Sequence, residues 1–363
     1  MDAQQTSPES ATPRPVRWFS WLILGALGVF FARIVNGSSP LAFFDFFELL
    51  VTLPLFALHL LVMAPLVIQR GSRVNLELLF LAGALFGLHE AYITKGLWAP
   101  PGNPEVWQVG GVAALETLGL VFFWYPLMAF SVPLYTLDGL TGGQQTLPLL
   151  LPVKWLVRLQ PRWMLLAAGV LCGLLLGARA GNIGLALLSS LSSALVIFLL
   201  ALAWQRLAKQ ETNNLFDLLP ERKEWRVLAL LLIADYIVLG FVLRREALPE
   251  LSGHIIIWAL SLLLIGLFWL AKRRAEGGAP GQKHRTGAPV SVPFVFSRWS
   301  WLWFTGGMVL VSAPASLLPD WAQNGVYLTL QVAASAAGVW LLVRTILNII
   351  KPGEIKFCLK KPK

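Results

Sequence analysis

The sequence predicts an all-α fold, a polytopic transmembrane helical bundle of about ten spans with both termini cytoplasmic. Of the 363 residues, 56% are hydrophobic and 13% are charged, whereas soluble domains carry about 25% charged residues. The apolar residues fall in blocks of about 18 or more, the length that a helix needs to cross roughly 30 Å of hydrocarbon. Lys and Arg residues gather in alternate connecting segments, as the positive-inside rule requires.

The predicted spans follow one another along most of the chain. They cover residues 18–35, 41–68, 76–95, 106–136, 162–180, 183–205, 226–243, 254–272, 299–318 and 326–350. The second and fourth spans are long and contain internal prolines, which predict kinks where neighbouring helices satisfy the freed carbonyl groups. The fifth span repeats glycine every four residues, at Gly169, Gly173, Gly177 and Gly181. This stripe predicts close helix packing, and we expect the serines of the next span to supply the partner surface.

The basic residues set the orientation. Of the 29 Lys and Arg residues, 23 lie in segments predicted to be cytoplasmic, 5 lie in the opposite segments, and Arg344 lies within the last span. The net charge of +10 is then explained by orientation and by attraction to anionic lipids at the cytoplasmic face. A nucleic-acid partner is not needed. We expect a multi-pass protein of the plasma (inner) membrane, in contact with the lipid bilayer.

The remaining segments are short. Residues 1–16 are predicted to be a disordered N-terminal tail, 17–350 the transmembrane domain with a flexible cytoplasmic loop at 275–297, and 351–363 a basic cytoplasmic tail. Arg17 and Trp18 open the first span and predict an anchor at the membrane interface. The two cysteines, Cys172 and Cys358, form neither a disulfide framework nor a metal motif.

Five ionisable side chains in three consecutive spans define the candidate site. Ionisable groups within spans are costly and mark functional sites. Asp45 and Glu48 lie in the outer third of the second span, His89 and Glu90 in the outer third of the third, and Glu116 near mid-depth in the fourth. Consecutive antiparallel spans are usually neighbours. The sequence therefore predicts an acidic pocket between spans 2–4 that opens outward.

The orientation of each group follows from helical spacing. Glu90 shares a face with Gly83 and Gly87, so we expect it to point inward. His89 is about 100° away and is expected to point toward the rim. Asp45 could instead be hydrated at the headgroups.

Other charged groups bear on this pocket. Glu48 and Glu90 could form ion pairs with Lys95, Arg33 or Arg179, which also lie near the outer surface. Asp235, in the middle of the seventh span, is expected to face the same cavity from across the bundle. His59 is expected to be a hydrogen-bonded packing residue.

These observations favour a transporter or permease, with the carboxylates serving proton or cation coupling. The alternative is an intramembrane enzyme acting on a lipid or lipid-linked substrate at the outer leaflet, although the HExxH and GxSxG motifs are absent. The third hypothesis is a non-catalytic subunit of a membrane complex. The substrate is then a small molecule or a lipid. The sequence identifies no cofactor, leaves metal binding unknown, and does not indicate an oligomeric state.

Overall fold

The computed structural model describes residues 12–69, 74–94, 96–97, 108–141, 147, 161–208, 214–243, 248–277 and 298–350. Nine helical segments among these residues are long and apolar enough to cross a membrane, which confirms the predicted all-α polytopic bundle. The strands of the described chain are β1 (Gln108–Val109) and β2 (Val112–Ala113), which pair in antiparallel fashion.

The helices follow the predicted spans closely. The α-helices are α1 (Arg14–Val29), α2 (Leu53–Val67), α3 (Leu76–Ile93), α4 (Ala114–Gly119), α5 (Val132–Leu140), α6 (Pro161–Arg179), α7 (Ile183–Leu207), α8 (Leu215–Leu218), α9 (Arg222–Ile237), α10 (Leu251–Gly277), α11 (Arg298–Ala315) and α12 (Asp320–Ile350). Several spans contain π-helical stretches: η1 (Phe30–Ile34), η3 (Glu48–Thr52), η4 (Leu120–Ser131) and η6 (Val238–Leu243). A 3₁₀ turn, η2 (Ala42–Phe44), precedes the second span.

Some boundaries differ from the prediction. The first helix begins at Arg14, inside the segment predicted to be disordered. Pro15 lies in its first turn, where a proline is tolerated because the backbone N–H has no partner within the helix. The span predicted at 299–318 forms α11 (Arg298–Ala315), which is not among the nine apolar segments found in the described chain. The tail 351–363, the loop from 278 onward and residue 95 lie outside the described residues.

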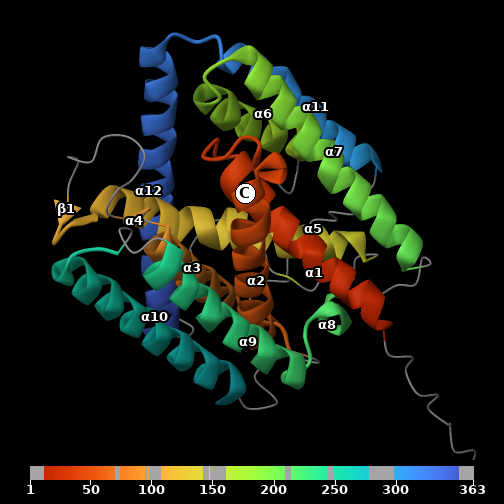
Figure 1. The fold of residues 1–363 in the computed structure, drawn as a ribbon. Helices are drawn as coiled ribbons and strands as arrows, with labels where there is room; N and C mark the ends of the chain where they lie inside the picture. Colours follow the sequence, from red (N-terminus) through yellow and green to blue (C-terminus); the bar gives the residue numbers. More distant parts are fainter. Residues whose placement is uncertain are drawn as a thin grey trace, which may run out of the picture.

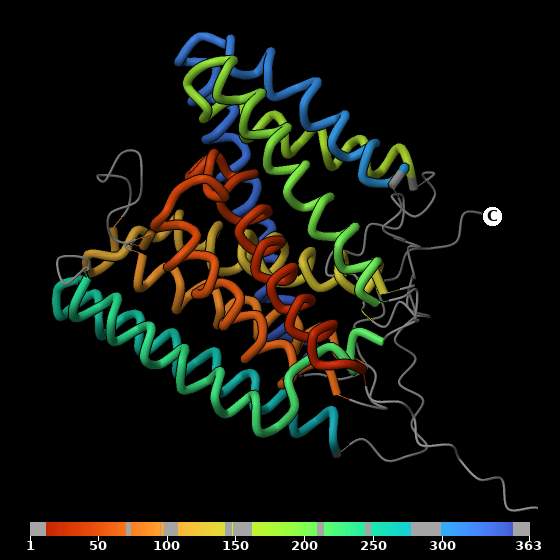
Figure 2. The backbone as a smooth tube through the Cα atoms, turned by 45° about the vertical axis from the view of Figure 1, so that its right-hand side comes forward, coloured from red at the N-terminus to blue at the C-terminus, as the bar shows by residue number. Residues whose placement is uncertain are grey.

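The helices form three layers with α12 crossing them, as Figures 1 and 2 show. One layer contains α6, α7 and α11. The middle layer contains α1, α2, α3 and the run from α4 through η4 to α5. The third layer contains α9, which packs on α2, and α10, which packs on α3. Helix α12 packs against α4 and η4. The middle layer is therefore covered on both sides.

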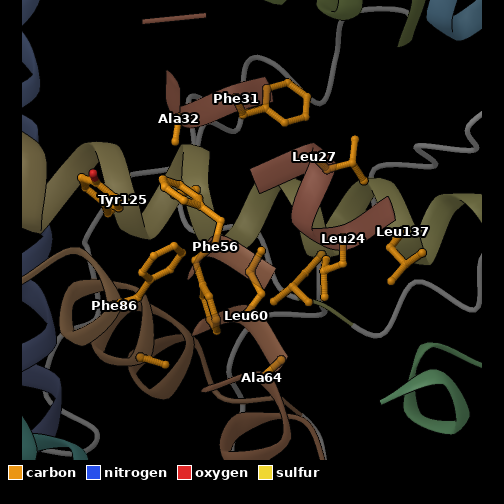
Figure 3. Packing of buried hydrophobic residues seen from close by; sticks show 14 of the residues in the cluster. Leu24, Leu27, Phe31, Ala32, Phe56, Leu60, Ala64, Phe86, Tyr125 and Leu137 are labelled. Carbon is orange, nitrogen blue, oxygen red and sulfur yellow. The ribbon is translucent and has the colours of Figure 1, made fainter. Parts of the chain in front are cut away.

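The densest packing lies within the middle layer (Figure 3). Leu24, Leu27, Phe56 and Phe86 are fully buried there, and Tyr125 is nearly so. The rings of Phe56 and Phe86 pack edge to face with centroids 5.4 Å apart. Within a bilayer, van der Waals contact of this kind holds helices together, because lipid tails are as apolar as the side chains. This packing fixes the positions of the first four spans.

The glycine stripe of α6 was predicted to pack on the next span in the sequence, α7. It packs on α11 instead. A Cβ added to Gly169, Gly173 or Gly177 would collide with backbone carbonyl groups of α11, whereas a Cβ added to Gly181 would meet nothing within 4 Å. Gly307 of α11 packs equally closely against α6, because an added Cβ there would lie 2.6 Å from the carbonyl oxygen of Leu166. The prediction failed because a small-residue face shows that a partner comes close without showing which helix it is.

Arg17 also does more than anchor the chain. It is only 7% exposed, whereas its neighbour Trp18 is 57% exposed. Arg17 donates to the carboxylates of Glu221, at 2.5 Å, and Glu224. These two carboxylates form the capping box at the start of α9, where negative charge is favourable. The pair thus ties the first span to the seventh.

Candidate functional site

An ion pair joins the end of the first span to the start of the second. Arg33 lies in η1 and Glu48 opens η3, and Arg33 Nη2 donates to Glu48 Oε1 at 2.8 Å. Glu48 is only 7% exposed. A buried charge needs both a counter-ion and hydrogen bonds, and Arg33 supplies the first. One of the ion pairs that the sequence allowed is therefore formed.

Glu90 lies beside this pair and is fully buried, at 0% exposure. The hydroxyl of Tyr125, from η4, donates to Glu90 Oε2, and the hydroxyl of Thr94 lies 3.4 Å from the same oxygen. The Tyr125 ring can come this close because Gly87 has no side chain: an added Cβ would lie 2.8 Å from Tyr125 Cγ. The glycine face of α3 is thus a helix-contact face, and Glu90 points into the bundle.

The three charged groups interact as one unit, the Arg33–Glu48–Glu90 cluster. The charge of Arg33 acts on both carboxylates. One guanidinium faces two carboxylates, so the cluster carries one excess negative charge when all three groups are ionised. Within the described residues, Arg33 Nε, Glu48 Oε2 and Glu90 Oε1 are buried without a hydrogen-bond partner. Leaving such atoms unpaired costs about 1–3 kcal/mol each.

The cluster residues stand on irregular helix geometry. Arg33, Glu48 and Tyr125 all lie in π-helical stretches. A π-helical turn widens the helix and re-aims the side chains, and such turns are frequent at functional sites. The first, second and fourth spans therefore depart from regular α-helix at the residues that they contribute to the surroundings of Glu90.

Two predicted site residues stand apart from the cluster. Asp45 is exposed, and its carboxylate accepts the backbone N–H of Glu48 at 2.9 Å. It therefore caps the helix that carries Glu48. Glu116 lies in the first turn of α4, which packs on α12, and its Oε2 is buried without a partner among the described residues. No ion pair or hydrogen bond of the described chain joins Glu116 to the cluster.

His89 faces a different part of the molecule. Its Nδ1 donates to the carbonyl oxygen of Leu85 at 2.8 Å. The ring borders a cavity of about 270 Å³ between α3 and α10, together with Tyr92, Trp258 and Ser261. His89 and Glu90 therefore point to different surroundings and do not act on one shared position.

His59 and Tyr236 link the middle layer to α9. His59 is fully buried, its Nδ1 donates to the carbonyl oxygen of Leu55 at 2.7 Å, and its Nε2 accepts from the hydroxyl of Tyr236. The ring also stacks on Phe86 at 4.6 Å. With both nitrogens bonded, His59 is a satisfied packing residue. Asp235, expected to face the same cavity as the acidic residues, instead lines a groove on another face of α9.

Sequence reasoning did not select Tyr125 as a site residue, and it considered Arg33 only as a possible ion-pair partner. Tyr125 lies in an aromatic apolar stretch in which no polar pattern marks it. Arg33 could have been selected from the sequence, since a cation at the end of an apolar span marks a possible functional site. Among the residues that the structure describes, no three His, Cys, Asp or Glu side chains converge in a way that could hold a metal ion.

The chain is similar to membrane proteins that are themselves uncharacterized. A family model described as "Uncharacterized membrane protein family" matches residues 22–355, a range that includes the whole cluster. An uncharacterized protein of Archaeoglobus fulgidus is 33% identical over 257 residues, which cover 68% of this chain and 76% of that protein. No solved structure matches. These matches agree with a multi-pass location in a membrane.

Proposed function

The chain belongs to the uncharacterized membrane protein family, and we propose that it is a transporter coupled to a proton or a small monovalent cation. The observation that carries the proposal is the Arg33–Glu48–Glu90 cluster, in which the guanidinium of Arg33 is paired with the buried carboxylate of Glu48 and acts electrostatically on a second buried carboxylate, Glu90. A bilayer-spanning protein keeps an uncompensated charge in its interior only at considerable cost.

The charge balance identifies the ligand class. With all groups ionised, one positive charge is missing, and one oxygen of each carboxylate has no partner in the described chain. A proton on one carboxylate, or a monovalent cation between the unpaired oxygens, restores neutrality and satisfies acceptors at the same time. Oxygen ligands suit small hard cations.

The position of the cluster explains how binding could drive movement. Arg33, Glu48, Glu90 and Tyr125 come from four different spans, so neutralising one carboxylate changes the attraction between helices rather than within one. Arg33 acts on both carboxylates, and loss of charge on Glu90 leaves it paired with Glu48 alone. Three of these residues lie in π-helical turns, which are frequent at functional sites, and we propose that the spans shift at these turns. Such a shift would couple cation binding to opening of the bundle.

The lipid-enzyme hypothesis has less support from the geometry. An acid and a base acting on one substrate must reach the same reacting group. His89 borders the cavity at α10, whereas Glu90 contacts Tyr125 in the interior. We therefore rank the small-molecule or lipid transporter first.

We also propose a plasma-membrane location with both termini in the cytoplasm. The reason is that 23 of the 29 Lys and Arg residues lie in the tails and in every second connection between predicted spans, and such basic segments remain in the cytoplasm. Cys358 in the C-terminal tail provides the test. In whole cells of a Cys172→Ser variant, a membrane-impermeant maleimide should label Cys358 only after permeabilisation. Labelling in intact cells would reverse the orientation.

The coupling proposal can be tested without knowing the substrate. Proteoliposomes adsorbed to a solid-supported membrane are exposed to a jump in pH, or in Na⁺ at constant ionic strength. Binding of a cation to a site inside the protein displaces charge and gives a transient current. We expect a transient from the wild type with one of the two jumps, and the responding ion identifies the coupling cation.

The matched variants are Glu90→Gln and Glu77→Gln, which change carboxylates at opposite ends of α3. Glu77 accepts a hydrogen bond from Asn348 at 2.7 Å and lies outside the cluster. Glu90→Gln should abolish the transient, and Glu77→Gln should preserve it. A transient that is absent from the wild type, or that is equal in Glu90→Gln, would overturn the proposal.

A further inference from the structure

A groove of about 520 Å³ runs between α1, α2 and α9, on the outer surface of the bundle and away from the cluster. Ten of its eleven lining residues are apolar or aromatic, and the other one is Asp235. Leu22, Leu231 and Val238 on its walls are 42%, 50% and 43% exposed. In a membrane-spanning protein an exposed apolar surface of this kind contacts lipid. The groove is therefore accessible from the bilayer.

Asp235 has no partner in the groove. Its Oδ2 is buried without a hydrogen bond to any described residue, and no cation of the described chain lies within ion-pair distance of it. Its neighbour in sequence, Tyr236, is directed to His59 on the other side of α9 and does not help it. The carboxylate thus stands alone in an apolar groove in the middle of a span, where a lone charge is expensive.

The nearest cation along α1 does not compensate this charge. Arg17 lies one helical turn before Trp21, a lining residue, but it is paired with Glu221 and Glu224. The Trp21 indole N–H is likewise occupied, since it donates to the carbonyl oxygen of Leu218 at 2.7 Å. The groove consequently offers an apolar surface and one unmet negative charge with acceptor oxygens.

We propose that this groove binds a lipid-soluble organic amine in its protonated form. The ammonium group would donate hydrogen bonds to the unpaired oxygens of Asp235, and the apolar body would lie along α1, α2 and α9. Charge-assisted hydrogen bonds of this kind are the strong ones, and a low-dielectric surrounding strengthens them further. The ligand enters laterally from the bilayer. This site is separate from the cluster and stands independently of the coupling proposal.

The test measures binding alone, with the full-length protein in nanodiscs of zwitterionic lipid. The probe is dansylcadaverine, a fluorescent amine with an apolar body, and its uncharged control is the N-pentyl dansylamide. Dansyl anisotropy is titrated for both probes. The wild type should bind the amine saturably and at least tenfold more tightly than the uncharged probe.

Three variants make the result specific. Asp235→Asn keeps the shape and removes the charge, so the affinity for the amine should fall at least tenfold and match that for the uncharged probe. Ala234→Phe fills the groove from an exposed lining position and should weaken both probes. Asp320→Asn removes an exposed carboxylate at the start of α12 and should change neither.

The proposal is overturned if the amine does not bind saturably, if Asp235→Asn binds it as tightly as the wild type, or if Asp320→Asn weakens it equally. Elution profile and melting midpoint of each variant are compared with the wild type, and a variant of Asp235 that does not fold is replaced by Asp235→Leu. Because charge displacement at Glu90 is measured separately, failure here does not alter that result.

Discussion

The first four spans and the α9–α10 pair accommodate their polar side chains in opposite ways. Between 50% and 78% of the apolar window of each of the first four spans is buried, compared with 17% for the spans of α9 and α10. The buried spans direct Arg33, Glu48 and Glu90 at one another. The outer helices turn Tyr236 toward His59 and His254 toward Tyr92, and they leave Asp235 facing the groove.

This difference shows what each region is built to do. In the inner bundle, the charge of Arg33 offsets that of Glu48 across two spans, and the cluster with Glu90 keeps one excess negative charge when all three groups are ionised. In the outer pair, hydrogen bonds attach the helices to the bundle. Among them, the Tyr236 hydroxyl bonds His59, the Trp225 indole N–H donates to the carbonyl oxygen of Val62, and the Tyr92 hydroxyl lies 2.9 Å from His254 Nδ1. The lone carboxylate there is compensated by nothing in the described chain. The predictions below test this contrast, from the largest effect to the smallest.

Removing Arg33 should have the largest effect. Arg33→Leu leaves two buried carboxylates without a cation, and breaking a buried pair in this way costs about 3–5 kcal/mol. The free energy of unfolding in detergent, measured by denaturant titration, checks this. Arg162→Leu is the control, because Arg162 is exposed at the start of α6, and it should stay within about 0.5 kcal/mol. Equal losses in both variants would contradict a compensated cluster.

Neighbouring glycines on α11 test the packing of the layer formed by α6, α7 and α11. Gly307→Ala places a Cβ against the backbone of α6, and overpacking of this kind costs about 1–3 kcal/mol. Gly306→Ala meets nothing within 4 Å and should stabilise the helix by up to about 1 kcal/mol. Opposite signs in thermal unfolding support the α6–α11 contact, and equal shifts argue against it.

Removing one hydrogen bond between α9 and the bundle should have a smaller effect than the changes at Arg33 and Gly307. Tyr236→Phe removes the hydroxyl that bonds His59 and leaves a buried ring nitrogen unpaired, at a cost of about 1–3 kcal/mol. Tyr327→Phe is the control, since the Tyr327 ring packs under Arg179 at 4.4 Å and phenylalanine keeps that ring. Hydrogen exchange of α9 amides should accelerate in the first variant alone. Unchanged protection in Tyr236→Phe would mean that the hydrogen bond does not hold α9.

The smallest effect is expected at the Arg17–Glu221 pair, which depends on pH. The hydrogen bond and charge of Arg17 lower the pKa of the Glu221 carboxyl in the folded protein below its ordinary value. Its contribution to stability is therefore present above the ordinary Glu pKa and is lost as pH falls through the folded-state value. Glu221→Gln should reduce stability at pH 6 and lose that effect at strongly acid pH. In an Arg17→Gln background the same substitution should have no pH-dependent effect.

Much of the fold could be predicted from the sequence because membrane spans have a strong signal. Apolar blocks and basic connections mark the spans, and the boundaries differ where local chemistry intervenes. Asp45, for example, caps a helix that starts at Phe46 rather than within the residues before it. The predicted partner of the glycine stripe was wrong. The stripe packs on α11, which is far from α6 in the sequence, and the pattern does not show which helix comes close.

The candidate site could be predicted only in part. Helical spacing was enough to turn Glu90 inward and to separate it from His89. It did not place His89, which borders the cavity between α3 and α10 and not the predicted outer rim. It could not reveal Tyr125, since the contact depends on Gly87 and on a π-helical stretch that alters the face of the span. It also placed Asp235 in the wrong cavity, because the rotation of an isolated span about its axis is set by packing.

The cation dependence of stability tests the central claim most directly. The melting midpoint of the purified protein is recorded from pH 8 to pH 5, and separately against increasing NaCl with N-methylglucamine chloride balancing ionic strength. A ligand that binds only the folded state stabilises it by about 2.7 kcal/mol at one hundred times its dissociation constant. We predict that the wild type is stabilised by protons or by Na⁺, and that Glu90→Gln is already stable and no longer responds. An equal response in the wild type and Glu90→Gln would show that the excess charge of the cluster binds no cation.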